Sequence, residues 1–397
     1  MNFTTDCIEQ CSPRIGTLSG FKRFPGMKFA TPLLLMYTKK GSIPHLTKEV
    51  QRMTGVNIKQ QILSISLPTI ISMKEILKQY NSFLEFVNMQ EHLTFLSIQD
   101  PSELTNKGFQ QTESIAVWSR HGRHSLTAEE YMEIVDIIKP DIYLALCDGD
   151  TDRDSTGKRA QKSVRRSQYL LEKCLEKHNN SETLKFSGIL GAVEGGYEII
   201  EREKCIKYLK NKDLLGYVID GLHRNGPETA AIKYEEINKI MQHTINMLPK
   251  EKLRVTMGCW NPIVVLDLIG LGVDVFDSSY AFLITEQLKA FTFQYESNNL
   301  HQIDETLPEI SLNDKRYAED FSPISPNCIC LTCKNHTKAY IHHLCQAKEL
   351  LAQVLLMIHN THHYIQFFEA IRTNLTNGTF PEFRKTIQIQ FESQITS

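Results

Sequence analysis

Three cysteines near the end of the chain have the type and spacing of a metal site. Cys328, Cys330 and Cys333 form the pattern C-x-C-x₂-C. Thiolates are soft ligands, and three on one tight loop favour tetrahedral zinc. A closed structural site needs a fourth ligand, and the downstream candidates are His336, His342, His343, Cys345, His359, His362 and His363. His336 is too close to the loop, and spacing does not choose among the rest. Three reduced, buried cysteines are the alternative.

Four carboxylates each follow a predicted strand at the point where it ends. They are Asp148, Glu194, Asp220 and Asp277. In a barrel of parallel strands the carboxyl ends meet at one mouth, which is where active sites lie. Carboxylates there suit a base or sugar ligand. The alternative for any one of them is the N-cap of the next helix, but all four at one mouth favour a site.

A basic face begins one of the predicted helices. Arg159, Lys162 and Arg166 are spaced to share a helical face. Lys334 and Lys338 follow the cysteines. Such patches can contact phosphates, although a charged face is more often simply solvated.

Short aliphatic runs predict eight strands that would position these residues. They are Thr31–Thr38, His92–Ile98, Ser114–Ser119, Ile142–Cys147, Phe186–Val193, Gly216–Leu222, Leu253–Gly258 and Val273–Asp277. Helical patterns occupy Tyr131–Lys139, Ser163–His178, Tyr197–Asn211, Ile232–Leu248 and Pro262–Leu271. This alternation of strand and helix predicts βαβ units, and eight strands predict a closed (β/α)₈ barrel. The alternative is an open doubly wound sheet. No G-x-G-x-x-G follows the first predicted strand, which disfavours the dinucleotide-binding form of that fold.

The pattern changes beyond the last predicted strand. Residues 283–327 are polar and irregular, and a helical stretch then runs from Thr337 to Arg372. Four aliphatic residues of this stretch are spaced to share a face: Leu344, Leu351, Leu355 and Ile358. We expect barrel strands and helices over residues 1–282, and a zinc subdomain with a long C-terminal helix over residues 305–372. Together they form one domain over residues 1–397.

Composition excludes several classes of protein. The chain has 397 residues, 41% hydrophobic and 23% charged, with a net charge of −2. These values exclude a disordered chain and a bulk polycation, so any nucleic-acid binding must come from a local patch. No run approaches the roughly 18 apolar residues of a membrane span. The N-terminus lacks the apolar core of a secretory signal, so a cytosolic chain with reduced cysteines is expected.

Motifs along nearly the whole chain resemble the tRNA-guanine transglycosylases, which exchange guanine in tRNA for queuine or its precursor. The matches are Arg14–Gly16, Thr31–Pro32, His45–Thr47, Leu126–Glu129, Gly191–Gly196, Gly216–Leu222, Asn313–Tyr317 and Asp320–Pro323. In that family a histidine 26 residues after the last cysteine completes the zinc site, and here that residue is His359. The resemblance implies a TIM-type barrel with an inserted zinc-binding subdomain near the C-terminus. It also implies one structural Zn²⁺, held by Cys328, Cys330, Cys333 and His359.

Departures from the family pattern indicate lost catalysis. Asp277 occupies the position of the nucleophile, but Ala281–Leu283 replaces a P-T-R motif and its arginine. The D-S-G-G loop with the acid/base aspartate is absent, with possible remnants at Asp100–Ser102 and Thr105–Gln110. The base-reading glutamine is Glu194, and a glycine of the G-G-L loop is Asp220.

The chain therefore resembles the non-catalytic members of the family. The resemblance implies a subunit with no catalytic residue of its own, which binds tRNA and pairs with a catalytic homologue in a heterodimer, or with itself when alone. It further implies a cytoplasmic location with peripheral association at the mitochondrial outer membrane. The alternatives are an active tRNA-guanine transglycosylase with Asp277 as nucleophile and a zinc-dependent interaction module unrelated to queuine.

Overall fold

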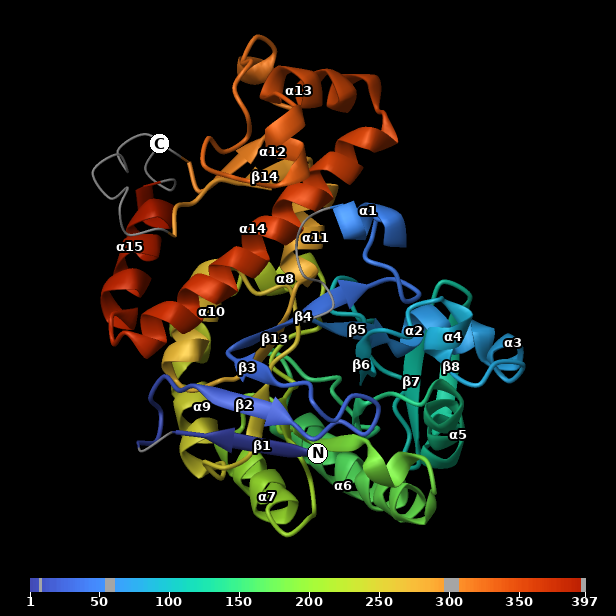
Figure 1. Ribbon diagram of the computed structural model, residues 1–397. Coiled ribbons are helices and arrows are strands. Elements are labelled where there is room, and N and C mark those ends of the chain that lie inside the picture. Colours follow the sequence, from blue (N-terminus) through green and yellow to red (C-terminus); the bar gives the residue numbers. More distant parts are fainter. Residues whose placement is uncertain (7–8, 54–60, 296–306, 394–397) are drawn as a thin grey trace. The chain divides into compact units, whose positions relative to one another are not determined.

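The computed structural model describes residues 1–6, 9–53, 61–295 and 307–393 (Figure 1). The chain divides into two compact units. The first contains residues 1–41 and 61–277, and the second contains residues 42–60 and 278–397. The predicted start of the zinc subdomain, residues 305 and 306, lies outside the described residues.

A closed barrel of eight parallel strands forms the centre of the first unit (Figure 1). In order around the barrel these are β4 (Leu33–Thr38), β5 (Ile62–Ser66), β6 (Leu93–Ser97), β9 (Ile142–Leu144), β10 (Gly188–Val193), β11 (Gly216–Ile219), β12 (Leu253–Val255) and β13 (Val275–Asp277). The ring closes where Val275 of β13 pairs with Leu33 of β4. All these strands are buried along their length, as parallel strands covered on both faces must be. The predicted (β/α)₈ barrel is confirmed.

One of the eight predicted barrel strands was wrong. Ser114–Ser119 is a strand, β7, but it pairs antiparallel with β8 (Gly122–Thr127) in a hairpin outside the barrel. The missing barrel strand is β5. The sequence pattern did not predict β5 because Ser64 and Ser66 interrupt its apolar residues.

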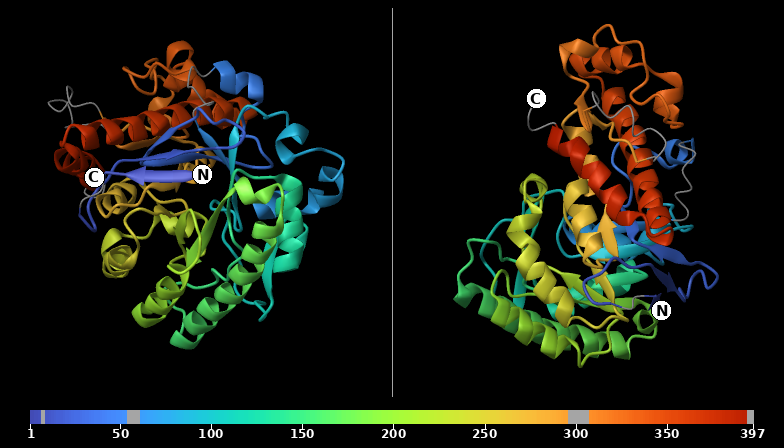
Figure 2. Two further views of the ribbon diagram at one scale, coloured as in Figure 1. Left: turned by 60° about the horizontal axis from the view of Figure 1, so that its bottom comes forward. Right: turned by 90° about the vertical axis from the view of Figure 1, so that its left-hand side faces the viewer.

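Each helix predicted between the barrel strands is present, and Figure 2 shows these helices around the barrel. Their ends differ from the predicted ones. They are α5 (Ala128–Ile138), α6 (Gly157–Asn180), α7 (Ile199–Leu209), α9 (Tyr234–Met247) and α10 (Pro262–Gly270). Thr127, Thr156 and Asn261 cap three of their N-termini by accepting a backbone N–H. Short helical segments complete this unit: α2 (Leu67–Ile70), η2 (Ile71–Met73), α3 (Lys74–Leu77), α4 (Phe83–Phe86), η3 (Leu184–Phe186) and α8 (Pro227–Ala230).

A three-stranded antiparallel sheet precedes the barrel and is blue in Figure 2. It consists of β1 (Asn2–Thr5), β2 (Gly16–Ser19) and β3 (Phe29–Thr31). Arg14, just before β2, forms a buried ion pair with Asp274 and donates to the carbonyl oxygens of Lys250 and Lys252 at 2.6 and 2.9 Å. These residues precede β12 and β13. The segment is therefore anchored where the barrel strands begin, which leaves the opposite end for a functional site.

The second unit is mainly helical. It contains α1 (Lys48–Met53), α11 (Ser279–Glu286), β14 (Lys289–Phe291), β15 (Glu309–Ser311), η5 (Lys315–Tyr317), α12 (Leu331–Asn335), α13 (Lys338–Ala347), α14 (Leu350–Thr376) and α15 (Phe380–Ser393). Strands β14 and β15 pair antiparallel within the stretch predicted to be irregular.

The single helix predicted from Thr337 to Arg372 is in fact two helices. Lys348 adopts a left-handed conformation with φ of 57° and ends α13. The predicted shared face is therefore interrupted: Leu355 and Ile358 are buried in α14, whereas Leu351 is exposed and Leu344 belongs to α13. Among the described residues, no helix has the length and apolarity needed to span a membrane.

Candidate metal centre and barrel mouth

Three thiols and one imidazole meet inside the second unit. The Nδ1 atom of His359 lies 3.7 Å from Sγ of Cys328, 3.7 Å from Sγ of Cys330 and 3.3 Å from Sγ of Cys333. All four ligand atoms lie within 4.8 Å of one another, so the group could hold a metal ion. Three sulfurs and one imidazole nitrogen form a donor set typical of tetrahedral structural zinc.

The orientation of His359 suits a metal ligand. Its Nε2 atom lies 2.8 Å from the carbonyl oxygen of Phe291, and donation from Nε2–H leaves the Nδ1 lone pair facing the thiols. The next residue, Asn360, accepts from the Phe291 N–H at 3.0 Å and donates to the Lys289 carbonyl at 2.9 Å. Helix α14 is thereby fixed to β14 by consecutive side chains.

Helix α12 carries two of the thiols to this helix. Cys330 is its N-cap, and its sulfur accepts from the Cys333 N–H at 3.3 Å. Thr332, fully buried, donates to the Leu355 carbonyl of α14 at 2.7 Å. A cluster of buried apolar residues surrounds the centre: Ala290, Ile310, Leu312, Ile324, Ile341, Leu344, Ala352, Leu355 and Leu356. The loop is thus held against α14 by packing and hydrogen bonds as well as by any metal.

The structure separates the candidates that spacing left open. Within the described part of the chain, His359 is the only histidine grouped with the thiols. His342 and His363 instead contact the carbonyl oxygens of Leu312 and Phe293, at 2.9 and 3.0 Å.

At the barrel mouth, Asp148 is held by two arginines. Arg159 makes a two-pronged contact with its carboxylate, and Nη1 of Arg166 donates to Oδ2 at 2.9 Å. Asp148 is fully buried. The predicted basic face of α6 is therefore wrong in part, because Arg159 and Arg166 are half-buried against a carboxylate, whereas Lys162, its third member, is exposed.

Glu194 and Asp220 lie beside each other and the thiol of Cys147. Glu194 is fully buried, and Ser163 donates to its Oε2 at 3.3 Å. Burial, with the nearby carboxylates of Asp220 and Asp148, raises the pKa of Glu194 well above its usual range. The shift favours the protonated, neutral form of this carboxyl group.

A buried arginine that sequence reasoning missed supports this region. Arg202 of α7 donates to the carbonyl oxygens of Gly196, Val193 and Asp220, at 2.6, 3.1 and 2.7 Å. The signal was present in the sequence, because Arg202 has helical spacing with the apolar Cys205, Ile206 and Leu209, which are also buried.

Side chains of the protein itself fill the acidic side of the mouth. A Cβ added at Gly149 would lie 2.5 Å from Oδ2 of Asp220, so that carboxylate packs directly on the glycine. The cavity beside Asp220 and Cys147 measures about 40 Å³. This cavity is small, and the Asp220 side chain forms part of its wall.

The fourth predicted carboxylate, Asp277, does not join this group of three. Its Oδ2 accepts the Gly258 N–H at 2.7 Å. The N-cap alternative fails for all four residues, because the caps of α6, α7, α8 and α11 are Thr156, Glu198, Gly226 and Ser278.

Asp100, in the possible remnant of the acid/base loop, is also held by neighbouring residues. Tyr37 donates its hydroxyl to Oδ1 at 2.8 Å, Ser66 donates to Oδ2 at 3.2 Å, and the Ser102 N–H donates to Oδ1 at 3.0 Å. Both carboxylate oxygens are thus engaged within the protein.

A (β/α)₈ barrel joined to a potential Cys₃His metal centre matches one known class of tRNA-modifying proteins. Residues 9–393 match the model of the queuine tRNA-ribosyltransferase family, and the chain belongs to this family. The resemblance drawn from the motifs is thereby confirmed.

Relatives with the same printed name align with almost the whole chain. Queuine tRNA-ribosyltransferase accessory subunit 2 of Anopheles gambiae is 39% identical over 389 residues, covering 97% of this chain and 89% of the relative. The proteins of that name from Aedes aegypti and Drosophila virilis are 37% and 39% identical, each covering 98% of this chain and 93% of the relative.

Proposed function

We propose that this chain is a non-catalytic subunit of a queuine tRNA-ribosyltransferase. In this proposal it binds a catalytic homologue and tRNA, and so supports the exchange of guanine for queuine at the wobble position. The observation that carries the proposal is the filled barrel mouth. Asp148 is held by Arg159 and Arg166, and the Asp220 carboxylate packs on Gly149.

The chemistry of base exchange explains why this arrangement argues against catalysis. A nucleophilic carboxylate must reach the ribose while the departing purine is held and protonated nearby. Here the Asp277 carboxylate accepts a backbone N–H, and Asp100 is engaged by Tyr37, Ser66 and Ser102. The small size of the cavity, about 40 Å³, supports a mouth that does not hold a purine.

We also propose that Cys328, Cys330, Cys333 and His359 bind one zinc ion with a structural role. Four protein ligands complete a tetrahedral shell and leave no open position for a substrate or an activated water. The metal would tie the α12 loop to α14, so its binding energy would contribute to the folding of the second unit.

The names of the relatives support a partner for this chain. An accessory subunit is named for its association with a main one, which favours a heterodimer with a catalytic homologue here. A homodimer in the absence of that partner, and a cytoplasmic location with peripheral attachment to the mitochondrial outer membrane, remain our proposals. Light scattering would measure the mass of this chain alone and of its mixture with the catalytic homologue, which tests the assembly. Fractionation of cells with salt washes would test the location.

The deciding experiment is the exchange of labelled guanine into a tRNA with guanine at the wobble position. The purified chain is assayed alone, the catalytic homologue alone, and then both together. We expect exchange to be strongest in the mixture and absent from this chain alone. Exchange by this chain alone would overturn the proposal and favour an active transglycosylase with Asp277 as nucleophile.

The variant Asp277→Asn sharpens this result. It keeps the shape of the side chain and an oxygen that can accept the Gly258 N–H. We expect the mixture to keep nearly all its activity with this variant. The aspartate at the matching position of the catalytic homologue serves as the control, and its replacement should abolish exchange. A large loss with Asp277→Asn, in a complex that still assembles, would contradict a non-catalytic role.

A further inference from the structure

A second depression lies on the first unit, on the opposite side of the barrel mouth from the acidic group. Its walls come from segments that follow β4, β5 and β6, and from the β7–β8 hairpin. The lining residues are Lys39, Lys40, Pro68, Thr69, Ser72, Asp100, Glu103, Trp118, Ser119, Arg120 and His121. We call it the hairpin groove. It measures about 190 Å³, several times the volume of the cavity beside Asp220.

The groove offers positive charge at its rim. Lys40 and Arg120 line the groove, and Arg123 lies opposite Trp118 in the β7–β8 hairpin. All three are exposed, and no described carboxylate forms an ion pair with any of them. Its two acidic residues are already engaged: Glu103 pairs with Lys39 at 2.9 Å, and Asp100 accepts four hydrogen bonds within the protein. The available charges therefore favour an anion.

Aromatic rings lie beside these cations. Phe109 is 62% exposed, and the Arg123 guanidinium lies 4.3 Å from the centre of its ring. Trp118 lines the groove and meets Phe109 edge to face, with ring centres 5.9 Å apart. An exposed ring (Phe109) and a half-buried ring (Trp118) therefore lie next to an arginine. Aromatic rings next to arginines are the combination that proteins use to stack unpaired bases while holding the phosphates.

We propose that the hairpin groove binds a single-stranded segment of RNA. The phosphates contact Lys40, Arg120 and Arg123, and a base stacks on Trp118 or Phe109. This proposal deepens the proposed function, on which it rests for tRNA as the natural source of the RNA. It moves the RNA contact away from the α6 face, where Arg159 and Arg166 are bound to Asp148.

Tryptophan fluorescence gives a local measure of this binding. The chain has two tryptophans, and Trp260 is only 2% exposed, so quenching by added RNA reports on Trp118. The probe is a ten-nucleotide oligouridylate, titrated into the full chain at several salt concentrations. We expect saturable quenching that weakens with salt, because bound phosphates release counterions. Trp118→Phe should remove the quenching, while anisotropy of labelled RNA still shows binding.

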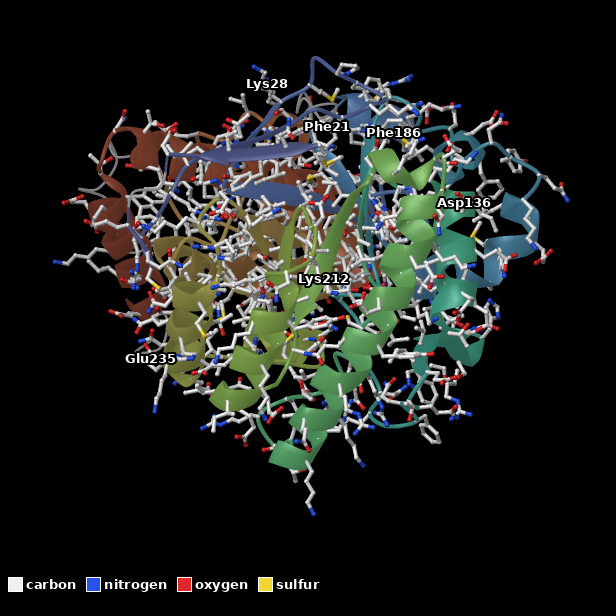
Figure 3. The ribbon with its side chains drawn as sticks, turned by 90° about the horizontal axis from the view of Figure 1, so that it is seen from below. Phe21, Lys28, Asp136, Phe186, Lys212 and Glu235 are labelled. Atoms are coloured by element: carbon white, nitrogen blue, oxygen red, sulfur yellow. The ribbon has the colours of Figure 1, made fainter. Side chains whose placement is uncertain are left out.

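A charge reversal at the hairpin tests the assignment. Arg120→Glu with Arg123→Glu should weaken RNA binding at least tenfold. The slope of the logarithm of the binding constant against the logarithm of salt concentration should become shallower by roughly 1.4, for two lost contacts to a single strand. The matched control is Lys28→Glu with Lys210→Glu, which changes the net charge equally. Both control lysines are exposed on other parts of this unit, and Lys28 projects outward in Figure 3. The four charge-reversed residues are exposed, Trp118 is half-buried, and melting curves verify the folding of every variant.

Each outcome decides the proposal. Weakening by the hairpin variant alone supports it. Equal weakening by both double variants, unchanged binding by the hairpin variant, or no RNA binding by the wild-type chain overturns it. In each of those cases guanine exchange in the mixture is assayed separately, so the proposed function stands or falls by its own result. If RNA binds through the hairpin but the mixture shows no guanine exchange, the RNA-binding groove is supported and the proposed function is contradicted.

Discussion

The Nε2 atom of His359 lies 2.8 Å from the carbonyl oxygen of Phe291, while Nδ1 of the same ring faces three thiols. One side chain thus joins the candidate metal centre to β14. The neighbouring Asn360 bonds to the same strand, so the centre is built into the core of the second unit rather than attached to its surface.

Replacing His359 by Ala should remove the bound zinc and loosen the second unit. The change deletes one metal ligand and the bond to Phe291, and leaves a cavity at a fully buried position. We expect about one zinc per wild-type chain and little in the variant, measured by elemental analysis. Hydrogen exchange should speed up in residues 307–393 more than in the barrel strands. His343→Ala, at an exposed position, is the control and should keep the metal. Full zinc content in the His359 variant would show that another residue completes the site.

Arg166→Glu should destabilise the barrel because it places a negative charge beside the buried Asp148. Breaking a buried ion pair costs about 3 kcal/mol or more. Lys162→Glu changes an exposed residue of the same helix and should alter stability by about 0.5 kcal/mol or less. Urea unfolding followed by circular dichroism measures both. Equal, small effects would mean that Arg166 is solvated in solution rather than bound to Asp148.

Glu194→Gln should stabilise the protein increasingly as the pH rises. Because the pKa of Glu194 is raised in the folded chain, the folded state holds a proton that the unfolded chain releases above its own pKa near 4.5. The stabilisation from this proton is complete below that pH and is lost as the pH rises. Glutamine stays neutral throughout, and each unit of pKa shift corresponds to about 1.4 kcal/mol.

The measurement is the difference in melting temperature between Glu194→Gln and wild type, from pH 5 to pH 9. Glu235→Gln is the control, because Glu235 is exposed and projects outward in Figure 3. A Glu194→Gln variant that is less stable than wild type at pH 8 would indicate that Arg202 keeps the carboxylate ionised.

His223 should contribute to loss of stability in acid. Burial lowers its pKa to about 4, below the usual 6.5, and its Nδ1 accepts the Asn225 N–H at 3.0 Å. The folded chain therefore resists a proton that the unfolded chain accepts. The associated stability is present above pH 6.5 and declines as the pH falls toward 4, by roughly 3 kcal/mol in all. His223→Gln should flatten this part of the stability curve, whereas His121→Gln, at an exposed position, should not. Parallel curves for all three proteins would contradict the assignment.

The sequence predicted the barrel because long runs of buried strand alternate with amphipathic helices. It placed Ser114–Ser119 wrongly, since a run of residues shows that a strand exists but not which neighbour it pairs with. It missed the break at Lys348, because a left-handed residue without glycine leaves little trace in the pattern.

Side-chain partners were harder to predict than elements. Helical spacing correctly placed Arg159 and Arg166 on one face. It could not predict that both would form ion pairs with Asp148. Likewise, spacing set aside His336 but could not choose His359 from the six remaining candidates, and the resemblance to a family singled it out. Which partner a polar residue takes depends on contacts far along the chain, and local patterns do not contain them.

The contact between Asp220 and Gly149 has a consequence for the proposed heterodimer. If one barrel of the pair is filled by its own carboxylate, the complex has a single place for the incoming base. Its saturation curve with queuine should then be a simple hyperbola with a Hill coefficient of one. In that assembly the filled barrel would influence the rate of exchange at the catalytic barrel, but it would not bind queuine itself.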